Sequence, residues 1–340
     1  MRWCYLAVIS GLFATQGLTA TVEGTVIDSS QQAIRHAQVT LRQTHLAKST
    51  TVYSDAEGYF SVELSDAGNY QLRARRLGFN TIIETAIAVE DDSSINRTLQ
   101  LKAVDKAQWV HELPASDWFA RVNFSSPEKR GQFAIQCAMC HQQGASTTRM
   151  PRSNDEWHKL FNMMGEYGAV MDQALFDEAP GALNKAYDFA QLDLNSFSDQ
   201  PLKKYNSQVE ITEWEIGHQT AFLHDMVIGH DGIIYSVDWI NDKLYGLNPT
   251  TNNIQEWAVP TGDLAPGGIL GILAERGRRY MHHTPTVAPH SLQVGPDNKL
   301  WITLSVGKGL ASFDPKTERF ETFDHPDRVK YPHTLRFDNK

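Results

Sequence analysis

The sequence has only three cysteines among its 340 residues, no dense block of lysine and arginine, and no long apolar run. With so few cysteines a disulfide framework is excluded, so hydrophobic cores must stabilise the fold. The formal net charge of −9 and the lack of a basic cluster disfavour nucleic-acid binding, which needs a positive surface. A chain of this length typically contains about two or three domains.

The first twenty residues, MRWCYLAVISGLFATQGLTA, predict an export signal. Arg2 supplies a positive start, an apolar run extends from about Trp3 to Phe13, and the small residue Ala20 offers a cleavage position. A membrane anchor is the alternative, but this run is shorter than the ~20 residues that span a bilayer. We therefore expect residues 1–20 to be a signal peptide that takes Cys4 with it. The mature chain is then periplasmic or exported and has no membrane span.

Short segments of alternating apolar and polar residues fill residues 21–102, with turn residues between them. Examples are TVEGTVID, AQVTLRQ, YFSVELS and YQLRARR. A period of two places apolar side chains on one face of a strand, and strands at this spacing are typical of two packed sheets. The region is predicted to be a β-sandwich.

Residues at the turns and inward-facing positions of this region form a specific pattern: Gly24, Asp28, Ala37, Val39, Leu41, the Asp55-x-x-Gly58-x-Phe60 turn, Tyr70 and Gly78-Phe79. In these positions the region resembles the carboxypeptidase regulatory-like (transthyretin-like) domain family, over about 80 residues. The resemblance implies a non-catalytic accessory module, common on exported proteins and sometimes associated with sugar or cell-wall material.

Residues 126–199 show the apolar period of helices, and we expect residues 103–125 before them to be a linker with a helical start. A serine followed three residues later by a glutamate predicts a helix start at Ser125 and again at Ser153. Beyond Ser153, apolar residues recur at intervals of three and four, at Trp157, Leu160, Phe161 and Met164. The region is predicted to be a small all-α, cytochrome c-like domain.

The motif CAMCH occupies residues 137–141 of this helical region. Two thiols separated by two residues, Cys137 and Cys140, reach the two vinyl groups of one haem, and the adjacent His141 then faces the iron. In an exported chain this spacing predicts one covalently attached haem c. A thioredoxin-like redox pair is less well supported, because no strand–helix–strand pattern surrounds the motif. Zinc is also less well supported, because no second cysteine pair completes a closed site.

A haem iron held by one histidine takes a sixth ligand or keeps an open position, and a methionine thioether raises the reduction potential. The nearby methionines are Met150, Met163, Met164 and Met171. Met164 shares the apolar helix face that begins at Trp157, whereas Met163 points about 100° away.

The segment CAMCH…RMPRSNDEWHKLFNMMGEYGAVM…YDFA resembles the haem-c domains of quinohaemoprotein amine dehydrogenase-like and related periplasmic cytochromes, over about 65 residues. The resemblance implies Met164 as the distal axial ligand. Met171 is the second candidate, at a position where leucine is commoner, and His158 is a further one. Filling the core is the alternative role for Met164. Arg149 and Arg152 are candidates to pair with haem propionates, or else lie exposed in a loop.

The chain repeats itself within residues 207–340. Residues 222–260 align with 288–326, and YPHTLRFDNK at 331–340 begins a third copy. A period near 43 residues, with a turn between the first two strands, predicts four-stranded blades of a β-propeller. A Gly-rich insertion at 261–286 lengthens the first interval.

Residues 209–216, VEITEWEI, are expected to supply a strand of an adjoining blade. The third copy stops after ten residues, and a propeller closes with about four blades or more. We therefore expect an incomplete propeller of about two and a half blades, an open strand edge, and a longer parent product.

The repeats carry PHSL at 289–292, PHTL at 332–335 and FLHDM at 222–226. In these motifs they resemble the streptogramin lyase (virginiamycin B lyase-like) propeller family, over about 130 residues. The resemblance implies that His224, His290 and His333 surround one axis, as in a metal or substrate site. The alternative is that each histidine caps a strand and bonds the backbone of its own blade. The family's catalytic His and Glu belong to later blades, so lyase activity is not implied.

These predictions favour a periplasmic electron-transfer protein with one haem c, a periplasmic redox partner, and accessory sandwich and propeller modules. The first alternative is a haem-coupled oxidoreductase or lyase-like enzyme whose catalytic blades lie beyond these residues. The second is an exported protein that binds polysaccharide, cell-wall material or a small molecule. Whether the chain is itself an enzyme is left open.

Overall fold

The computed structural model describes residues 19–138, 142–166, 169–191, 193, 209–271, 284–307, 309–324 and 331–338. The chain divides into two compact units, one formed by residues 1–45 with 49–213 and the other by residues 46–48 with 214–340. The expected signal peptide falls almost entirely outside the described residues. Within the described ranges, no helix combines the length and apolar character needed to cross a bilayer. The protein is multidomain and mostly β, with several sheets and five α-helices in its described part.

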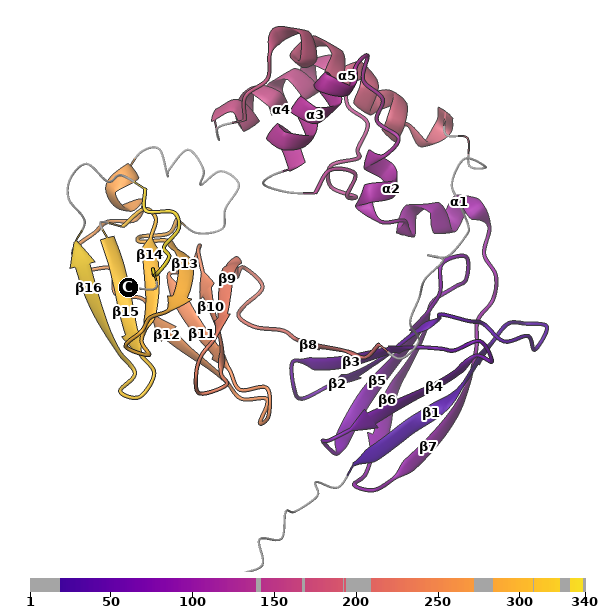
Figure 1. Ribbon diagram of the computed structural model, residues 1–340. Helices are drawn as coiled ribbons and strands as arrows, with labels where there is room; N and C mark the ends of the chain where they lie inside the picture. Colours follow the sequence, from indigo (N-terminus) through magenta and orange to yellow (C-terminus); the bar gives the residue numbers. More distant parts are fainter. Residues whose placement is uncertain are drawn as a thin grey trace, which may run out of the picture. The chain divides into compact units, whose positions relative to one another are not determined.

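The first unit begins with two sheets that share one apolar core (Figure 1). One sheet has the order β4-β1-β7, and the other has the order β6-β5-β2-β3-β8. Burial alternates along the strands, as in β4, because every second side chain faces the other sheet. The sandwich-like fold predicted for this region is confirmed. The strands are β1 (Ala20–Ile27), β2 (Gln38–Gln43), β3 (Lys48–Tyr53), β4 (Tyr59–Leu64), β5 (Gly68–Arg75), β6 (Ile82–Val89), β7 (Ser94–Gln100) and β8 (Ile211–Trp214).

The Asp55-x-x-Gly58-x-Phe60 turn leads into β4. The Asp55 Oδ1 atom accepts hydrogen bonds from the backbone N–H groups of Glu57 and Tyr59, at 3.0 and 2.8 Å. Gly58 has φ +77°, and a Cβ there would lie 2.5 Å from the Val26 carbonyl oxygen, so only glycine fits. The turn delivers Phe60 into the core.

Strand β8 corrects the expectation that residues 209–216 form part of a propeller blade. In the structure β8 lies beside β3 as the last strand of the five-stranded sheet. An edge strand exposes unpaired N–H and C=O groups, and β8 satisfies those of β3. The partner lies more than 150 residues earlier in the chain, and no local pattern predicts such pairing.

The five helices pack around a second core that contains Trp118, Phe133, Trp157, Leu175 and Leu183 (Figure 1). The helices are α1 (Lys106–Trp109), α2 (Ala115–Phe119), α3 (Pro127–Ala138), α4 (Asn154–Glu166) and α5 (Gln173–Tyr187). Short 3₁₀ turns follow α1 and α5, at Val110–Glu112 and Phe189–Gln191.

Residues 103–125, which we expected to be a linker with a helical start, do contain a helix near their beginning. They form α1 and α2, and Trp109, Val110, Trp118 and Val122 are buried in the helical core. Helices of four and five residues are too short to show a repeating apolar period, so their burial in the helical core was not predicted. The indole rings are what tie this segment to α3–α5.

The predicted helix starts are confirmed in one case and shifted in the other. Before α4, Ser153 and Glu156 form the reciprocal capping box: the Ser153 backbone N–H donates to Glu156 Oε2 at 2.8 Å, and the Glu156 N–H donates to Ser153 Oγ at 3.3 Å. Before α3, Ser126 rather than Ser125 accepts the N–H of Lys129, at 3.3 Å. Ser125 instead bonds through its hydroxyl to a carboxylate of α5 at 2.7 Å.

The second unit contains two four-stranded sheets, ordered β12-β11-β10-β9 and β13-β14-β15-β16, with every neighbouring pair antiparallel. They correspond to the two aligned repeats, and apolar residues of both sheets form one core. The strands are β9 (Leu223–Ile228), β10 (Ile234–Asp238), β11 (Lys243–Leu247), β12 (Ile254–Ala258), β13 (Pro289–Val294), β14 (Leu300–Leu304), β15 (Gly309–Asp314) and β16 (Arg319–Asp324).

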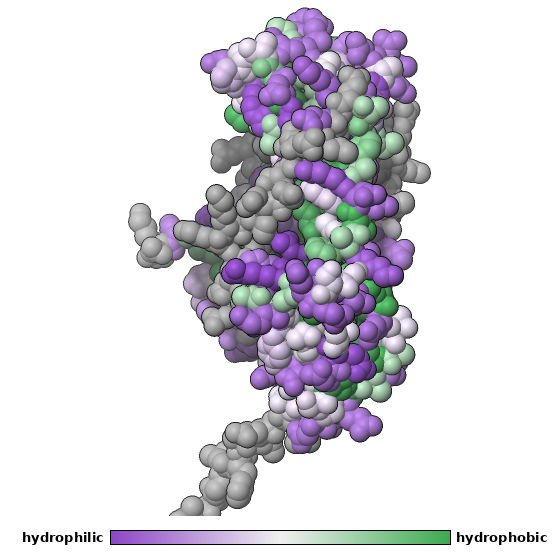
Figure 2. Space-filling model, turned by 90° about the vertical axis from the view of Figure 1, so that its right-hand side faces the viewer, coloured by the Kyte–Doolittle hydropathy of each residue, from purple (hydrophilic) through white to green (hydrophobic). Residues whose placement is uncertain are grey.

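The turn between the first two strands is built identically in both repeats. Asp231 Oδ1 accepts the backbone N–H of Ile233 at 3.0 Å, and Asp297 Oδ1 accepts that of Lys299 at 3.1 Å. The internal repeat in the sequence is therefore a repeat in structure. Residues 331–338, where a third copy was expected to begin, form no helix or strand. Across the face shown in Figure 2, hydrophilic and hydrophobic residues are interspersed.

Candidate functional site

The predicted haem motif begins at the end of α3. Cys137 occupies the last turn of that helix, is half-buried, and packs against the helical core. Cys140 and His141 lie outside the described residues. The site is therefore built from Cys137 and from the segments that surround the motif on either side.

The described residues on either side of the motif are held in place by two contacts. The side-chain amide of Gln143 donates a hydrogen bond from Nε2 to the carbonyl oxygen of Cys137 at 2.7 Å. Gly144 follows with φ +86°, and a Cβ there would lie 2.3 Å from the Ala115 carbonyl oxygen. Only glycine permits this close approach to α2. The two contacts hold the chain on both sides of the motif against the helical core.

Of the two methionine candidates, Met171 lies in the segment that contacts α3. The Val170 backbone N–H donates to Gln136 Oε1 at 2.9 Å, and these two residues directly precede Met171 and Cys137. Met171 packs against the helical core. Asp172 then caps α5 by accepting the Leu175 N–H at 2.7 Å. Sequence reasoning missed Gln136, Gln143 and Asp172, of which only the aspartate before an apolar helix carried a recognisable signal.

Met164 and Met163 are both half-buried in the last turns of α4. Neither is among the described side chains that pack against the helical core, whereas Leu160 of the same helix is. The Met164 carbonyl oxygen accepts the N–H of Ala169 at 3.1 Å, which ends the helix. The structure thus separates the candidates: Met171 touches the core beside α3, and Met164 lies at a helix end.

Arg149 and Arg152, the candidates for haem propionates, stack on tryptophan rings. The Arg149 guanidinium carbon lies 4.4 Å from the Trp118 ring centroid, and that of Arg152 lies 4.7 Å from the Trp157 centroid. Arg149 also donates to the carbonyl oxygen of His111 at 2.7 Å. Burial lowers the pKa of Arg149 from its ordinary value. Both arginines therefore order the loop after the motif.

His158, the minor candidate, stacks on Phe176 of α5 with ring centroids 4.6 Å apart. Its Nε2 atom is buried and has no hydrogen-bond partner among the described residues, and the same holds for the Tyr187 hydroxyl, whose pKa burial raises to about 12. A buried polar atom without a partner costs free energy and is uncommon in a protein core. Within the described part of the chain, the helical core thus leaves these two polar atoms unsatisfied.

The three histidines of the repeats form a contiguous cluster in the second unit. The ring centroids of His224 and His290 are 3.8 Å apart, and those of His290 and His333 are 4.1 Å apart. His224 Nδ1 lies 3.1 Å from the His290 carbonyl oxygen, so this histidine bonds the neighbouring sheet and not its own. The Thr303 hydroxyl donates to the His333 carbonyl oxygen at 3.2 Å. The three rings therefore lie next to one another, with His290 in the middle.

The middle ring of this histidine cluster is buried, and the outer two are exposed. His290 is 5% exposed, and its pKa falls to about 4, first because burial penalises the charged form and then because His224 and His333 repel a second positive charge. Both ring pairs are tilted, at 40° and 52°, and across the described residues no set of three His, Cys, Asp or Glu side chains is arranged to hold a metal ion. The lowered pKa keeps the buried middle imidazole of His290 neutral at ordinary pH.

Comparison with known families and structures bears on parts of the chain. Residues 21–102 match the carboxypeptidase regulatory-like domain family, which confirms that resemblance. A comparison with curated proteins finds no match.

Among solved structures, an inactive variant of virginiamycin B lyase from Staphylococcus aureus with quinupristin is similar at 16% identity and a TM-score of 0.28. The similarity covers 37% of this chain, which spans 34% of that lyase chain. A streptogramin B lyase structure is similar to the same extent, at 15% identity. Hydroxyquinol 1,2-dioxygenase from Pseudomonas putida matches 27% of this chain and 58% of its own, at 10% identity and a TM-score of 0.22.

Proposed function

We propose that the chain is a periplasmic electron-transfer protein that carries one covalently attached haem c in its helical region. The observation that carries the proposal is the CAMCH motif, which begins in the last turn of α3 and whose flanking residues are held by the Gln143–Cys137 bond and by the close approach of Gly144 to α2. Thiols at this spacing followed by a histidine are the attachment pattern of haem c.

The donor groups near the motif fit this cofactor. Cys137 and Cys140 provide the two thiols, His141 provides the proximal imidazole, and the nearby thioethers provide a sixth ligand. The unsatisfied Nε2 atom of His158 is consistent with a core that a further group completes. When bound, the haem supplies a one-electron redox centre. Cys137 and Cys140 would anchor the haem, and His141 would supply an imidazole to its iron.

Two contacts support Met171 as the distal ligand ahead of Met164. The Gln136–Val170 bond holds the segment before Met171 against the helix that ends in the motif, and the Met171 side chain packs on the same core as Cys137. Met164 has no comparable contact with that core in the described part of the chain. A thioether there raises the reduction potential relative to a second histidine.

In this proposal the remaining regions recognise partners. The carboxypeptidase regulatory-like domain at 21–102 is an accessory module for a polysaccharide, cell-wall or small-molecule ligand. The two repeated sheets are blades of a β-propeller that offers a platform for a redox partner in the periplasm.

The proposal is tested by producing the exported chain together with a cytochrome c maturation system. A pyridine haemochrome spectrum is expected to show one haem c per chain, and Cys137→Ala with Cys140→Ala is expected to abolish it. A weak red absorption band from sulfur ligation should disappear in Met171→Ala and persist in Met164→Ala, the matched control. Full-length chain without covalent haem would refute the function, and loss of the band only in Met164→Ala would reverse the ligand assignment.

A second candidate function is a lyase-like or oxidoreductase enzyme, and the histidine cluster favours it. His224 and His333 are exposed on either side of the buried His290, so the cluster offers imidazole nitrogens to a ligand. The chain should then bind a streptogramin B antibiotic in equilibrium dialysis, and His224→Asn and His333→Asn should each weaken the binding; no ring opening is expected, because the resemblance places the family's catalytic His and Glu in later blades. Absence of binding would remove this candidate and leave the electron-transfer proposal intact.

A further inference from the structure

Two arginines stand side by side on the outer face of β5. Leu72 and Ala74 of this strand are fully buried in the sandwich core. Because side chains alternate along a strand, Arg73 and Arg75 point to the opposite face, where Arg73 is exposed and Arg75 is half-buried. Residues two apart on a strand lie about 7 Å from each other, so the two cations are neighbours.

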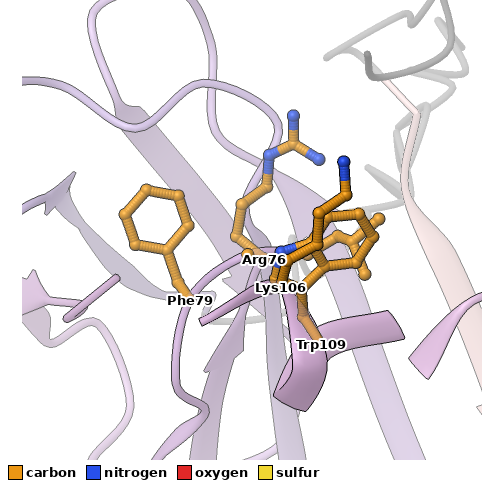
Figure 3. A pocket seen from close by; sticks show the side chains of 6 residues that line it. Arg76, Phe79, Lys106 and Trp109 are labelled. Atoms are coloured by element: carbon orange, nitrogen blue, oxygen red, sulfur yellow. The ribbon is translucent and has the colours of Figure 1, made fainter. Parts of the chain in front are cut away.

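These two arginines differ from the other arginines of the sandwich. Arg76, for example, donates from Nε to the Arg35 carbonyl oxygen at 3.1 Å and lines the cavity drawn in Figure 3. Four arginines of residues 21–102 have such a contact: Arg35, Arg42, Arg76 and Arg97. Arg73 and Arg75 have no hydrogen bond or ion pair with any residue that the structure describes. Their charges are available to a ligand.

The strands around the pair contain no competing carboxylate. Neither β2, β3 nor β5 has an aspartate or glutamate. Glu84 of β6 is paired with Arg97 at 3.4 Å. The outer face of the other sheet has Glu23 and Glu63 instead, each beside a fully buried valine. The sandwich therefore has a cationic and an acidic outer face, and the cationic face attracts anions although the chain has a net charge of −9.

The arrangement suits a ligand that has carboxylates at several points along its length. A planar guanidinium binds one carboxylate with two parallel hydrogen bonds. A ligand with a single carboxylate engages one of the two arginines at a time, whereas a chain with a carboxylate on each unit engages both, and the second contact gains from the linkage.

Amide groups on the same face match the hydroxyl groups of a sugar chain. Gln71 lies on the same side of β5 as Arg73, and Gln38 of β2 is the partner of Arg75 in the sheet register. Both glutamines are half-buried. An amide offers both donors and an acceptor to hydroxyl groups.

Two other classes of anionic partner need more cations than this face has. Recognition of an anionic membrane typically uses about four to eight clustered lysines and arginines. Tight binding of nucleic acid typically uses roughly six to ten phosphate contacts. A pair of arginines flanked by amides fits neither class.

We propose that the outer face of β5 binds an acidic polysaccharide, whose carboxylates pair with Arg73 and Arg75 and whose hydroxyl groups bond to Gln38 and Gln71. The inference rests on the accessory role proposed above for the carboxypeptidase regulatory-like domain, and it specifies the ligand and the surface. It does not depend on haem attachment, because no residue of this face belongs to the helical region.

The probe is polygalacturonate immobilised on a biolayer interferometry sensor, with the full-length chain in solution. Saturable binding is expected, and it should weaken with added salt because the charges are exposed. Arg73→Gln and Arg75→Gln should each weaken binding about three- to fivefold, as expected for the loss of one exposed ion pair, and the double variant about tenfold.

Arg97→Gln is the matched control. It removes the same charge from the same domain, but Arg97 is paired with Glu84 and lies outside the proposed surface, so binding should stay within about twofold of wild type. Circular dichroism and the thermal midpoint of each variant are measured alongside. Arg73→Lys keeps the charge without the planar fork and should fall between wild type and Arg73→Gln.

The methyl-esterified polymer has the same sugar backbone without the charges, and it should bind about tenfold more weakly. Equal binding of this polymer, an equal loss in Arg97→Gln, or tighter binding to phosphatidylglycerol vesicles or single-stranded DNA would each overturn the proposal. Self-association that Arg73→Gln abolishes would also overturn it, by placing a second copy on this face. Since haem content is read separately from the haemochrome spectrum, absence of polymer binding would reject this inference without bearing on electron transfer.

Discussion

The sandwich and the helical region bury different kinds of side chain. The sandwich core consists of aliphatic residues with Phe60 and Tyr70, supplied by strands that alternate between core and solvent. The helical core contains several indole rings and, at its edge, the sulfur atoms of Cys137 and Met171. An aliphatic core between two sheets is complete in itself. The helical core has sulfur atoms at its edge, next to the segment where we propose that the haem is attached.

The largest expected effect is a loss of structure in the helical region while the sandwich stays folded. Replacing both Cys137 and Cys140 by alanine removes the covalent attachment, and the helices should lose most of their amide hydrogen-exchange protection while β1–β7 keep theirs. Hydrogen exchange monitored by mass spectrometry resolves the two regions. Equal protection of the helices in variant and wild type would show that this core, like the sandwich, needs no added group.

The converse prediction concerns a substitution that destabilises the sandwich and leaves the helical region intact. Phe60→Ala removes a nearly fully buried ring from the apolar core, and the free energy of unfolding of the sandwich should fall by about 3–5 kcal/mol. The haem spectrum should not change. Tyr59→Ala is the matched control. Tyr59 directly precedes Phe60 and its side chain is exposed, so its replacement should reduce the free energy of unfolding much less. A haem spectrum that changes with Phe60→Ala would mean that the two regions are not independent.

The histidine cluster should make the stability of the second unit depend on pH, and this effect is expected to be of intermediate size. The pKa of His290 falls from 6.5 in the unfolded chain to about 4 in the fold, so the folded state takes up its proton later than the unfolded state. The contribution of His290 to the free energy of unfolding is therefore complete above pH 6.5 and is lost as the pH falls toward 4. Each pKa unit of difference between the folded and unfolded states corresponds to about 1.4 kcal/mol. Denaturant unfolding at several pH values should show a steeper acid loss in wild type than in His290→Asn. Parallel pH profiles would contradict burial of a neutral imidazole.

The smallest effect concerns the capping box before α4. Ser153→Ala removes the acceptor for the Glu156 N–H, and the stability of the helical region should fall by about 1 kcal/mol. Ser125→Ala is the comparison, because Ser125 bonds to Glu178 and not to a helix N–H. Denaturant titration followed by circular dichroism measures both. A larger loss in Ser125→Ala would show that the contact with α5 matters more than the cap.

The sequence predicts well what depends on local spacing. Alternating residues indicate the sandwich strands, Ser153 and Glu156 indicate a helix start, and the repeated Asp231 and Asp297 turns indicate matching sheets. These features are formed by neighbours in the chain, and so their signals are short-range.

What the sequence does not predict depends on distant contacts. The pairing of β8 with β3 joins segments more than 150 residues apart, and the burial of α1 and α2 follows from indoles that meet α3–α5 only in the fold. The support for Met171 over Met164 likewise rests on the contact between Gln136 and Val170, 34 residues apart. No pattern of apolar residues contains that information.

The most direct test of the haem proposal is the mass of one peptide. Trypsin cleaves after Arg130 and Arg149, which releases residues 131–149 with both cysteines of the motif and His141. For the exported chain produced with cytochrome c maturation, we predict that this peptide carries the added mass of one haem and absorbs in the Soret region. The same peptide recovered at its bare mass, with two unmodified thiols, would contradict the account.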